Sequence, residues 1–331
     1  MRVGFVGAGA IARSHLGILA AIPGTSVAAV CDLNVAVAEE TAGAAGGAAV
    51  YSEVGEMLAA ERLDAVFVCT PPGAHLAAAA PAFERGLPVY LEKPLARTAA
   101  DGEAIVAAWR KSGVVCAVGY QWRSIEVMDR IRAELGGDPP GLVVSRGIGP
   151  AQRGRTSSWF EDASASGGVL FELASHYIDL QRSVAGPVVE VQASSAAGLL
   201  ATAAAGAPGL DDAVGVVMRF AGGGLGIVAL GWTNAQDPPV YSLDVMAADV
   251  ALRLDMARPV RVHGRSRGAE VDATAAVDAR RASIARFLDA ASGGGQAAIA
   301  SSPEDALGTL TTLLAAERSV ATGERVTVAG G

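Results

Sequence analysis

The sequence predicts an α/β protein of two domains, the first built on a doubly wound parallel sheet and the second on an open, mostly antiparallel sheet. The first third of the chain alternates short apolar runs with longer amphipathic stretches. After about Gly119 the apolar runs follow one another with few helices between them. At 331 residues the chain also exceeds the length of one typical domain. We therefore expect a first domain over residues 1–121 and a second over residues 122–331.

Five short apolar runs in the first third are predicted to be strands. They are continuous rather than alternating in polarity, as expected for strands that are buried on both faces. Helical stretches separate them, so right-handed crossovers would place the strands parallel in one sheet. The runs are Val3–Val6, Val27–Cys31, Ala65–Cys69, Val89–Leu91 and Val114–Val118, and the clearest helices are Ile11–Ala21, Ala74–Arg85 and Ala99–Lys111.

The second domain is expected to contain strands in series. A helix over Ile125–Leu135 stops at Gly136–Pro140, whose glycines and prolines end helices. Strands with few helices between them favour antiparallel pairing. The predicted strands are Leu142–Ser145, Val188–Ala193, Ala213–Phe220, Leu225–Leu230, Tyr241–Met246 and Val250–Leu254, the further helices are Val169–Val184, Ala279–Ala291 and Pro303–Ser319, and Gly198–Gly209 is a predicted loop.

Composition disfavours several classes of partner. With 51% hydrophobic and 18% charged residues, the chain can bury a large core. A net charge of −8 and a pI near 5.1 disfavour nucleic acid and anionic membranes as partners. The three cysteines lie far apart, so we expect buried thiols rather than a disulfide framework or a metal site. Polar residues interrupt the first apolar stretch at Arg13–His15, and no run is long enough to span a membrane, so we expect a cytoplasmic protein.

A phosphate-binding turn is predicted at Gly7-Ala8-Gly9-Ala10-Ile11-Ala12, where the first strand meets the first helix. In this Gly-x-Gly-x-x-Ala pattern the first glycine permits a tight turn and the second lets the backbone approach a pyrophosphate. The small third residue lets the helix pack closely on the strand, and the helix N-terminus presents N–H groups to the phosphates. A chain with 41 glycines matches such a pattern by chance, but its place between strand and helix predicts a Rossmann dinucleotide site.

Asp32 is the predicted ribose ligand. It ends the second strand, 25 positions after Gly7 (32 − 7). A carboxylate there accepts hydrogen bonds from the adenosine ribose hydroxyls and repels a 2′-phosphate. Leu33 and Asn34 offer no positive charge to such a phosphate, so the sequence favours NAD over NADP. The alternative is a carboxylate that only caps a helix or a turn.

Another strand ends in Cys69-Thr70-Pro71-Pro72-Gly73-Ala74-His75. The carboxyl ends of parallel strands are where open α/β sheets bind ligands. The two prolines would hold a rigid loop against the cofactor, so Thr70, Pro71 and His75 are predicted cofactor contacts, with His75 beginning the next helix. A purely structural turn with a solvated His75 is the alternative.

Lys93 is the leading candidate for proton chemistry. It stands in Leu91-Glu92-Lys93-Pro94-Leu95, again after a predicted strand, so Glu92 and Lys93 are both predicted cofactor contacts. Of the 26 basic residues only Lys93 and Lys111 are lysines. Lys93 is therefore a lysine in a chain that uses arginine for nearly all of its other positive charges. A desolvated ammonium can lose its proton, which a guanidinium does not. A Lys–Pro bond can also be cis at modest cost. An ordinary surface lysine is the alternative.

The second domain places a carboxylate and an imidazole on one predicted helix. Glu172, His176 and Asp179 are four and three positions apart, on neighbouring turns of an otherwise apolar helix face. A carboxylate and an imidazole that point the same way suit general acid–base catalysis. For His176 the alternative is a hydrogen-bonded core residue with no catalytic role. For Asp179 the alternative is a role in orienting its neighbours or capping the helix.

Together these segments resemble the glucose-fructose oxidoreductase, inositol dehydrogenase and MocA family. The resemblance covers essentially the whole chain through GAGAIA, CTPPGAH, LEKPL, VGYQWR and GGVLFELASHYID, in family order. LEKPL followed downstream by carboxylate-x-x-x-His is highly specific, whereas the glycine motif is not. The resemblance implies a Rossmann domain and a C-terminal α/β domain whose open sheet commonly packs into homodimers or homotetramers.

The resemblance also implies roles for the site residues. Lys93 of the EKP motif and His176 of the second motif would act on a substrate hydroxyl that faces the nicotinamide. Glu172 would fix the geometry, although many polyol dehydrogenases of the family carry Asp there, which leaves the orientation of the substrate open. Arg123, in Tyr120-Gln121-Trp122-Arg123, and Trp159 are predicted substrate contacts, with an ordinary core or surface role as the alternative for each.

The sequence thus predicts an NAD(H)-dependent oxidoreductase for a secondary alcohol or ketone of a sugar, polyol or cyclitol. Two alternatives stay open. One is a redox-neutral sugar-converting enzyme with a retained cofactor. The other is a non-catalytic nucleotide-binding regulator, which is expected to lack Lys93 or His176, although both are present.

Overall fold

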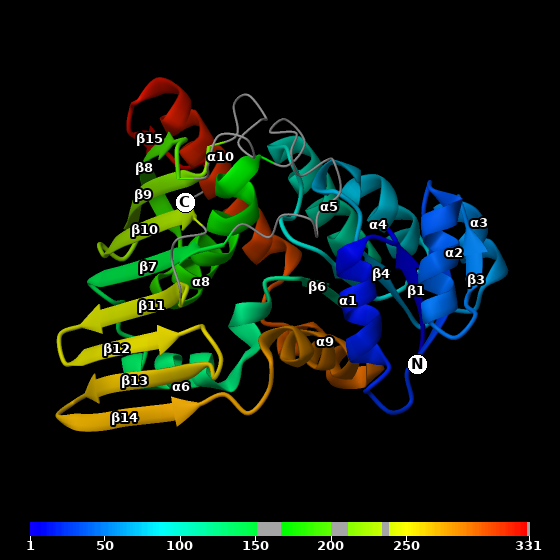
Figure 1. Cartoon of the computed structure of the whole chain (residues 1–331), viewed down its shortest axis with the longest axis horizontal. Helices are drawn as coiled ribbons and strands as arrows, with labels where there is room; N and C mark the ends of the chain where they lie inside the picture. Colours follow the sequence, from blue (N-terminus) through cyan, green and yellow to red (C-terminus); the bar gives the residue numbers. More distant parts are fainter. Residues whose placement is uncertain (151–166, 200–210, 234–237, 330–331) are drawn as a thin grey trace. The chain divides into compact units, whose positions relative to one another are not determined.

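Residues 1–150, 167–199, 211–233 and 238–329 are described by the computed structural model (Figure 1). Their contacts divide the chain into two compact units. The first unit comprises Met1–Gln121 and Arg280–Leu307, and the second comprises Trp122–Ala279 and Gly308–Gly331. The chain therefore leaves the first unit, builds most of the second, and then returns.

A six-stranded parallel sheet forms the centre of the first unit. Its strand order is β3-β2-β1-β4-β5-β6, so the chain adds strands on one side of β1 and then on the other. This is the order of a dinucleotide-binding Rossmann fold, with its switch point between β1 and β4. The predicted fold class is confirmed for this unit. The strands are β1 (Arg2–Val6), β2 (Ser26–Cys31), β3 (Ala49–Tyr51), β4 (Ala65–Val68), β5 (Val89–Leu91) and β6 (Cys116–Val118).

Local sequence signals set the helix ends of this unit. The side chain of Asn34 accepts a hydrogen bond at the start of α2, and Thr98 does the same at the start of α5. Gly113, in a left-handed conformation, ends α5. The helices are α1 (Ala10–Leu19), α2 (Val35–Ala44), α3 (Val54–Ala60), η1 (Pro72–Ala74), α4 (His75–Glu84) and α5 (Ala99–Ser112).

The returning segment completes the core of the first unit. In α9 (Ala279–Asp289), the Phe287 ring lies 5.5 Å from the ring centroids of both Phe67 and Tyr90, in edge-on contact. The sequence analysis placed residues 280–307 in the second domain, whereas their contacts group them with the first unit. The reason is that the apolar side of α9 is buried in the cluster that covers this sheet. Two short helices, η5 (Ala290–Gly294) and η6 (Gln296–Ala298), follow.

A nine-stranded sheet forms the second unit, with strand order β14-β13-β12-β11-β7-β10-β9-β8-β15. Every neighbouring pair is antiparallel except β7 with β10. The predicted open, mostly antiparallel sheet is therefore confirmed. The strands are β7 (Leu142–Gly149), β8 (Val188–Ala196), β9 (Ala213–Phe220), β10 (Leu225–Trp232), β11 (Val240–Ala247), β12 (Val250–Asp255), β13 (Arg261–Ser266), β14 (Ala269–Thr274) and β15 (Val326–Thr327).

Helices cover one face of this second sheet (Figure 1). Gln181 of α8 donates hydrogen bonds of 2.9 Å to the Ser145 hydroxyl and the Ile227 carbonyl, which anchors α8 on the sheet. Val217 (44% exposed) and Leu225 (41% exposed) point the other way, because alternate strand residues face opposite sides. Besides α8 (Ser175–Ala185), the helices of this unit are η2 (Gln121–Ser124), α6 (Glu126–Leu135), η4 (Leu170–Ala174) and most of α10 (Pro303–Thr322).

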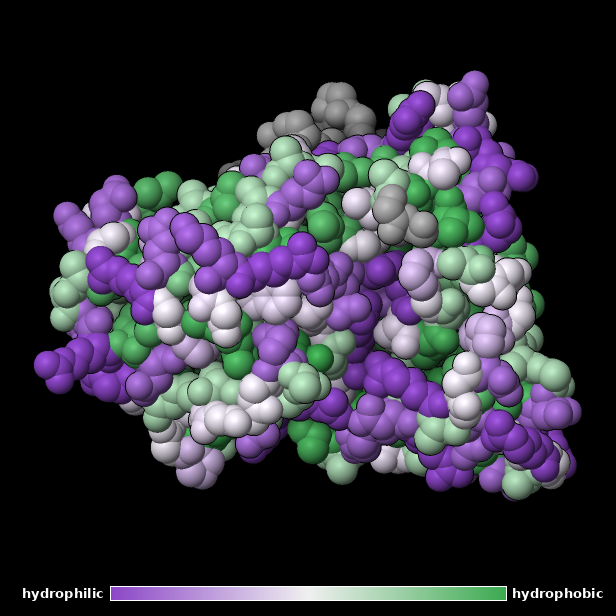
Figure 2. All heavy atoms as spheres, turned by 180° about the vertical axis from the view of Figure 1, so that it is seen from behind, coloured by the Kyte–Doolittle hydropathy of each residue, from purple (hydrophilic) through white to green (hydrophobic). Residues whose placement is uncertain are grey.

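The surface and the thiols of the described residues carry no unusual feature. Figure 2 shows hydrophilic residues interspersed with apolar ones over the face that it draws. No described helix has the length and apolar character needed to cross a membrane. Cys31, Cys69 and Cys116 are buried free thiols, as predicted.

Candidate cofactor site and catalytic residues

The glycine turn lies where β1 meets α1, at the carboxyl edge of the parallel sheet. Gly7 has a φ of +92°, and a Cβ there would lie 2.6 Å from the carbonyl carbon of Cys69, so only glycine fits. Gly9 differs, because its φ is −70° and a Cβ there would meet no protein atom within 4 Å. Neither conformation nor packing requires glycine at position 9. The open space beside its backbone fits a ligand that approaches closely.

The N-terminus of α1 is available to an anion. No side chain caps the helix at Gly9, and its first turn holds no acidic residue. Its first N–H groups and the positive end of its dipole therefore suit a phosphate. Nearby, the buried hydroxyl of Thr70 has no hydrogen-bond partner among the described residues. An unsatisfied buried hydroxyl at a strand end fits a ligand that supplies the partner.

Asp32 links the turn to the end of β2. Its Oδ2 accepts a hydrogen bond of 2.8 Å from the Ala8 amide, and its Oδ1 accepts one of 2.9 Å from the Asn34 amide. Each carboxylate oxygen keeps acceptor capacity for a ribose hydroxyl. Burial, together with the charges of Asp32, Glu53 and Glu56, raises the pKa of Cys31 to about 11, so the surroundings are acidic. An acidic environment disfavours a 2′-phosphate, so these residues fit NAD.

His75 is buried and braces two loops at the sheet edge. Its Nδ1 lies 3.1 Å from the Leu95 carbonyl oxygen, and its Nε2 lies 3.0 Å from the Thr70 carbonyl oxygen. Burial lowers the pKa of His75, while the carbonyls and the charge of Glu92 oppose this. The alternative of a solvated His75 is therefore wrong. The other predicted residues of this edge lie at Ala10, which begins α1, at Ile11, which follows in α1, and at Pro71, which precedes η1.

Glu92 is turned into the protein beside Lys93. Its Oε1 accepts a hydrogen bond of 2.7 Å from His15 Nε2, and its Oε2 accepts one of 3.1 Å from the Lys93 amide. Burial alone would raise the pKa of Glu92, but His15 and the charges of Lys93 and Arg280 together lower it to about 2. Glu92 is therefore an ionised residue held by the protein itself, so any effect of its carboxylate on a cofactor is indirect.

Lys93 follows β5 and is half-buried, and the Lys93–Pro94 peptide bond is cis. It belongs to the first unit, whereas Glu172 and His176 belong to the second. Each unit thus carries its own part of the predicted catalytic set. Trp159, the remaining predicted substrate contact, lies outside the described residues.

The helix of the second motif is not regular. Glu172 lies in the π-helical turn η4, while His176 lies in the first turn of α8. A π-turn closes i→i+5 hydrogen bonds, so the α-helical spacing used to align Glu172 with His176 does not apply across it. Such turns occur often at functional sites. Both side chains are half-buried.

Arg123 and Asp179 form a buried ion pair. Arg123 Nε donates to Asp179 Oδ2 at 2.7 Å and Nη2 donates to Oδ1 at 2.8 Å. Thr309 adds a hydrogen bond of 3.0 Å to the same carboxylate. Burial raises the pKa of Asp179, and the paired Arg123 opposes that rise. The Arg123 guanidinium, which was predicted to bind substrate, is thus paired inside the core. Asp179 therefore helps to fix the position of α8 through this ion pair.

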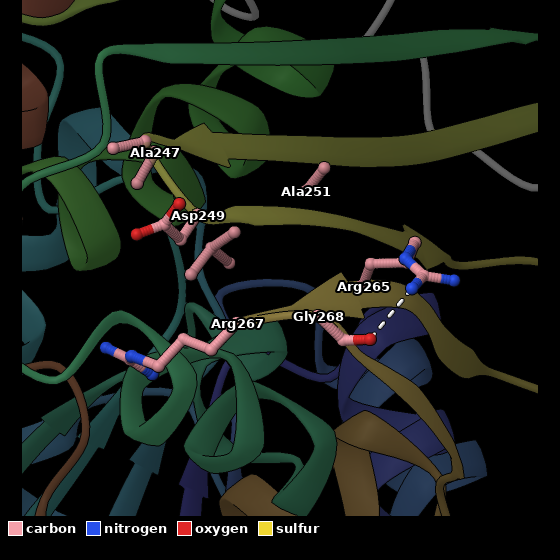
Figure 3. Close-up of a pocket in the computed structure, with 8 residues that line it drawn as sticks. Ala247, Asp249, Ala251, Arg265, Arg267 and Gly268 are labelled. Carbon is pink, nitrogen blue, oxygen red and sulfur yellow. Dashed lines mark hydrogen bonds between the residues drawn. The ribbon is translucent and has the colours of Figure 1, made fainter.

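A shallow pocket of about 650 Å³ is lined by eight residues, none of which is a predicted site residue (Figure 3). It lies at the hairpin turns of the second sheet. Arg265 donates to the Gly268 carbonyl at 2.7 Å, and Arg267 donates to the Glu134 carbonyl at the end of α6 at 2.8 Å. Both arginines thus stabilise local backbone, so the pocket holds no catalytic arrangement.

Three residues of the first unit escaped the sequence analysis as site residues: His15, Gly119 and Arg280. His15 contacts Glu92, and Gly119 leaves no room for a Cβ, which would lie 3.2 Å from the same carboxylate. Arg280 donates to the hydroxyl of Ser14 at 2.6 Å and to Gln121 at 3.1 Å. His15 could have been recognised from the sequence, because it is a polar residue four positions after Ile11 on a mostly apolar helix. Nothing local connects Arg280 with this edge.

Two family models match the chain. "Oxidoreductase family, NAD-binding Rossmann fold" matches residues 1–120, and "GFO/IDH/MocA C-terminal domain" matches residues 137–249. The 4-carboxy-2-hydroxymuconate-6-semialdehyde dehydrogenase of Sphingobium sp. is 34% identical over 37% of this chain and 39% of its own length. The myo-inositol 2-dehydrogenase of Thermotoga maritima is 26% identical over 69% of this chain and 67% of its own length.

A solved structure shares the whole fold. The myo-inositol dehydrogenase of Corynebacterium glutamicum superimposes with a TM-score of 0.79 and 22% identity, over 100% of this chain and 99% of that one. At this identity the likeness concerns the fold. The arrangement of a Rossmann unit followed by a mostly antiparallel sheet is therefore shared by chains that differ at most positions.

The ionised state of Glu92 predicts a dependence of stability on pH. Its folded pKa of about 2 lies below the ordinary glutamate pKa of 4.5. The carboxylate therefore stabilises the fold above about pH 4.5, and this contribution disappears as pH falls towards 2. A shift of this size corresponds to an order of 3 kcal/mol. The difference in free energy of unfolding between wild type and Glu92→Gln should be constant from pH 7 to 5 and shrink below it, as measured by urea denaturation. A difference that grows on acidification would contradict the assigned charge.

Proposed function

We propose that this chain, which belongs to the glucose-fructose oxidoreductase, inositol dehydrogenase and MocA family, is an NAD(H)-dependent oxidoreductase for a secondary alcohol or ketone of a sugar, polyol or cyclitol. The observation that carries the proposal is the cradle in the first unit. There Gly9 leaves its backbone open, α1 lacks a cap, and Asp32 presents acceptors in acidic surroundings, with Lys93 following a strand of the same sheet. The name of the Thermotoga relative supports a cyclitol as the substrate class.

The residues that would hold the cofactor are those of the cradle. The turn Gly7–Ile11 and the start of α1 would bind the pyrophosphate, Asp32 the adenosine ribose, and Thr70 with Pro71 the part nearer the reacting end. When bound, the nicotinamide exchanges a hydride with the substrate carbon.

Proton movement falls to the side chains of this chain. A ring nitrogen of His176 would take the hydroxyl proton during oxidation and return it during reduction. The Lys93 ammonium would hold the substrate oxygen and stabilise its developing negative charge. Glu172 would fix the substrate relative to His176. Because reacting atoms must be held about 3–3.5 Å apart, each of these side chains would have to contact the substrate directly.

The direct test is the absorbance of reduced nicotinamide during turnover. The purified protein is given NAD with a panel of inositols, sugars and sugar acids, and NADH with the corresponding ketones. We expect stoichiometric NADH formation with at least one secondary alcohol. Product formation with no net NADH would establish the redox-neutral alternative instead. Binding of NADH without any turnover over the panel would favour the regulator.

Lys93→Met tests the catalytic assignment. Loss of the ammonium should lower kcat by about 10²–10⁴-fold, because oxyanion and proton-transfer contributions of this size are lost. The dissociation constant for NADH, measured by fluorescence, should stay within about threefold. The matched control is Lys111→Met, which removes the exposed second lysine in the last turn of α5 and should leave both quantities unchanged. Turnover of Lys93→Met near the wild-type rate would remove Lys93 from the mechanism.

We also propose a homodimer or homotetramer that pairs through the uncovered face of the second sheet. Val217 and Ile227 lie opposite each other on the central strands β9 and β10, and Val217 is 44% exposed. Around them the face carries ion pairs such as Arg253 with Asp244 at 2.6 Å. An apolar centre with a charged rim suits an interface between copies. A cytoplasmic location stays a prediction from the sequence.

Val217→Asp tests this interface. A buried carboxylate without a partner opposes association, so the mass in solution should fall to half that of the wild-type assembly, as measured by light scattering after size exclusion. Val277→Asp is the matched control, since Val277 is 38% exposed in a segment outside the strands. A wild-type protein that runs as a monomer, or a Val217→Asp variant with unchanged mass, would contradict the proposal.

A further inference from the structure

Two buried histidines of the first unit lie next to the Lys93 loop, and the acid–base roles proposed above use neither of them. His15 belongs to α1 and His75 begins α4, and both are 0% exposed. A fully buried imidazole is an unusual core residue, because its ring nitrogens must find partners. Each of these two rings has one partner on the segment that carries Lys93: Glu92 for His15 and the Leu95 carbonyl for His75.

His15 acts on the residue before Lys93. Its ring packs edge-on against Tyr90, with centroids 5.6 Å apart, and its Nδ1 has no hydrogen-bond partner among the described residues. An ionised carboxylate can only accept, so His15 Nε2 donates the hydrogen bond of 2.7 Å to Glu92. The aromatic surroundings exclude water and strengthen this charge-assisted bond.

The Glu92 carboxylate connects His15 to the backbone of Lys93. Its second oxygen accepts from the Lys93 amide at 3.1 Å, so one carboxylate joins α1 to the loop. Gly119, after β6, lies against the carboxylate so closely that a Cβ would come within 3.2 Å. Arg280, from α9, adds a favourable charge. The carboxylate is thus confined from four segments of the chain.

His75 acts on the other end of the loop. Its Nδ1 lies 3.1 Å from the carbonyl of Leu95, two residues after Lys93, and its Nε2 lies 3.0 Å from the carbonyl of Thr70. The ring lies between the loop after β5 and the loop after β4, and as a neutral imidazole with one N–H it donates to one of these two carbonyls. Leu95 itself is 0% exposed, so this end of the loop is also fixed by packing.

We propose that His15 and His75 are positioning residues for Lys93, His15 through the carboxylate of Glu92 and His75 through the carbonyl of Leu95. The lysine stem then leaves a backbone that is held on both sides, so its ammonium samples fewer directions. Misplacing a catalytic group by about 1 Å can lower the rate on the order of 10²-fold. The gain in rate from a well-placed Lys93 can therefore outweigh the cost of burying a polar imidazole ring. The catalytic consequence rests on the proposed function, whereas the positioning itself does not.

The first test separates turnover from binding. In His15→Ala and His75→Ala, kcat should fall about 10- to 100-fold while the dissociation constant for NADH changes less than about threefold. His15→Gln keeps a donor that can reach Glu92 and should recover part of the loss. Leu16→Ala, at the next position of α1, removes buried apolar volume with no polar group. It should lower the melting temperature but leave kcat unchanged.

The second test does not depend on activity. Only two lysines are present, so reductive methylation with ¹³C-formaldehyde gives two lysine signals, and Lys111→Arg assigns them. We expect the Lys93 signal of the wild-type protein to differ from that of exposed Lys111. In His15→Ala and His75→Ala it should move towards the Lys111 position, while in Leu16→Ala it should not.

The two tests distinguish failure of this inference from failure of the proposed function. A protein without dehydrogenase activity whose Lys93 signal still moves in the histidine variants keeps the positioning role and loses only its catalytic consequence. A Lys93 signal that is unchanged in His15→Ala and His75→Ala overturns the inference. So does a Leu16→Ala variant that moves the signal as far, since the effect would then be general loosening of α1.

Discussion

One buried negative charge organises the edge of the first unit. Glu92 is 8% exposed and ionised, and an isolated carboxylate in that position would strongly destabilise the fold. Its charge is tolerated because His15 donates to it, Arg280 lies near it, and the adjacent amide of Lys93 completes its hydrogen bonds. Removing any of these partners leaves part of the cost uncompensated. This requirement links α1, β5, β6 and α9.

The same requirement explains why the chain returns to its first unit. α9 brings Phe287 into the aromatic cluster with Phe67 and Tyr90, and Arg280 to the side of Glu92. Tyr90 also shares a hydrogen bond of 3.1 Å with Ser283 of the same helix. The helix therefore contributes both apolar burial and a compensating charge. A Rossmann unit that ended at residue 121 would lack both contributions.

The regular parts of the fold could be predicted because their patterns are local. Continuous apolar runs identified the parallel strands, and the Gly7 turn is required by a φ of +92° together with a close backbone. The strands β13 and β14 were missed, since Arg261–Ser266 and Ala269–Thr274 each bury few apolar residues at one end of the sheet. The three-residue β3 was missed for its shortness. Strands at or next to the edge of a sheet, like these three, are specified by their neighbours more than by their own sequence.

The site was harder to predict than the fold, because its contacts join distant positions. Lys93 was identified because the chain has few lysines and this one follows a strand. Helical spacing identified Glu172 and His176 but assumed a regular helix, and the π-turn at Glu172 cannot be deduced from a four-residue interval. The role of Arg123 was inferred from the resemblance of residues 120–123 to a family segment, whereas its partner Asp179 lies 56 positions away. A side chain that pairs across such a distance is recognised only when the fold brings the two segments together.

The two units hold their proposed catalytic groups by different physical means. In the first, the backbone on both sides of Lys93 is fixed by buried imidazoles. In the second, His176 lies between a π-turn and the Arg123–Asp179 ion pair, which Thr309 of α10 reinforces. A bidentate buried pair resists rotation of α8, while a π-turn offers a less regular backbone on which Glu172 can be placed. Rigidity is thus concentrated at Lys93 and at the carboxyl-terminal side of His176.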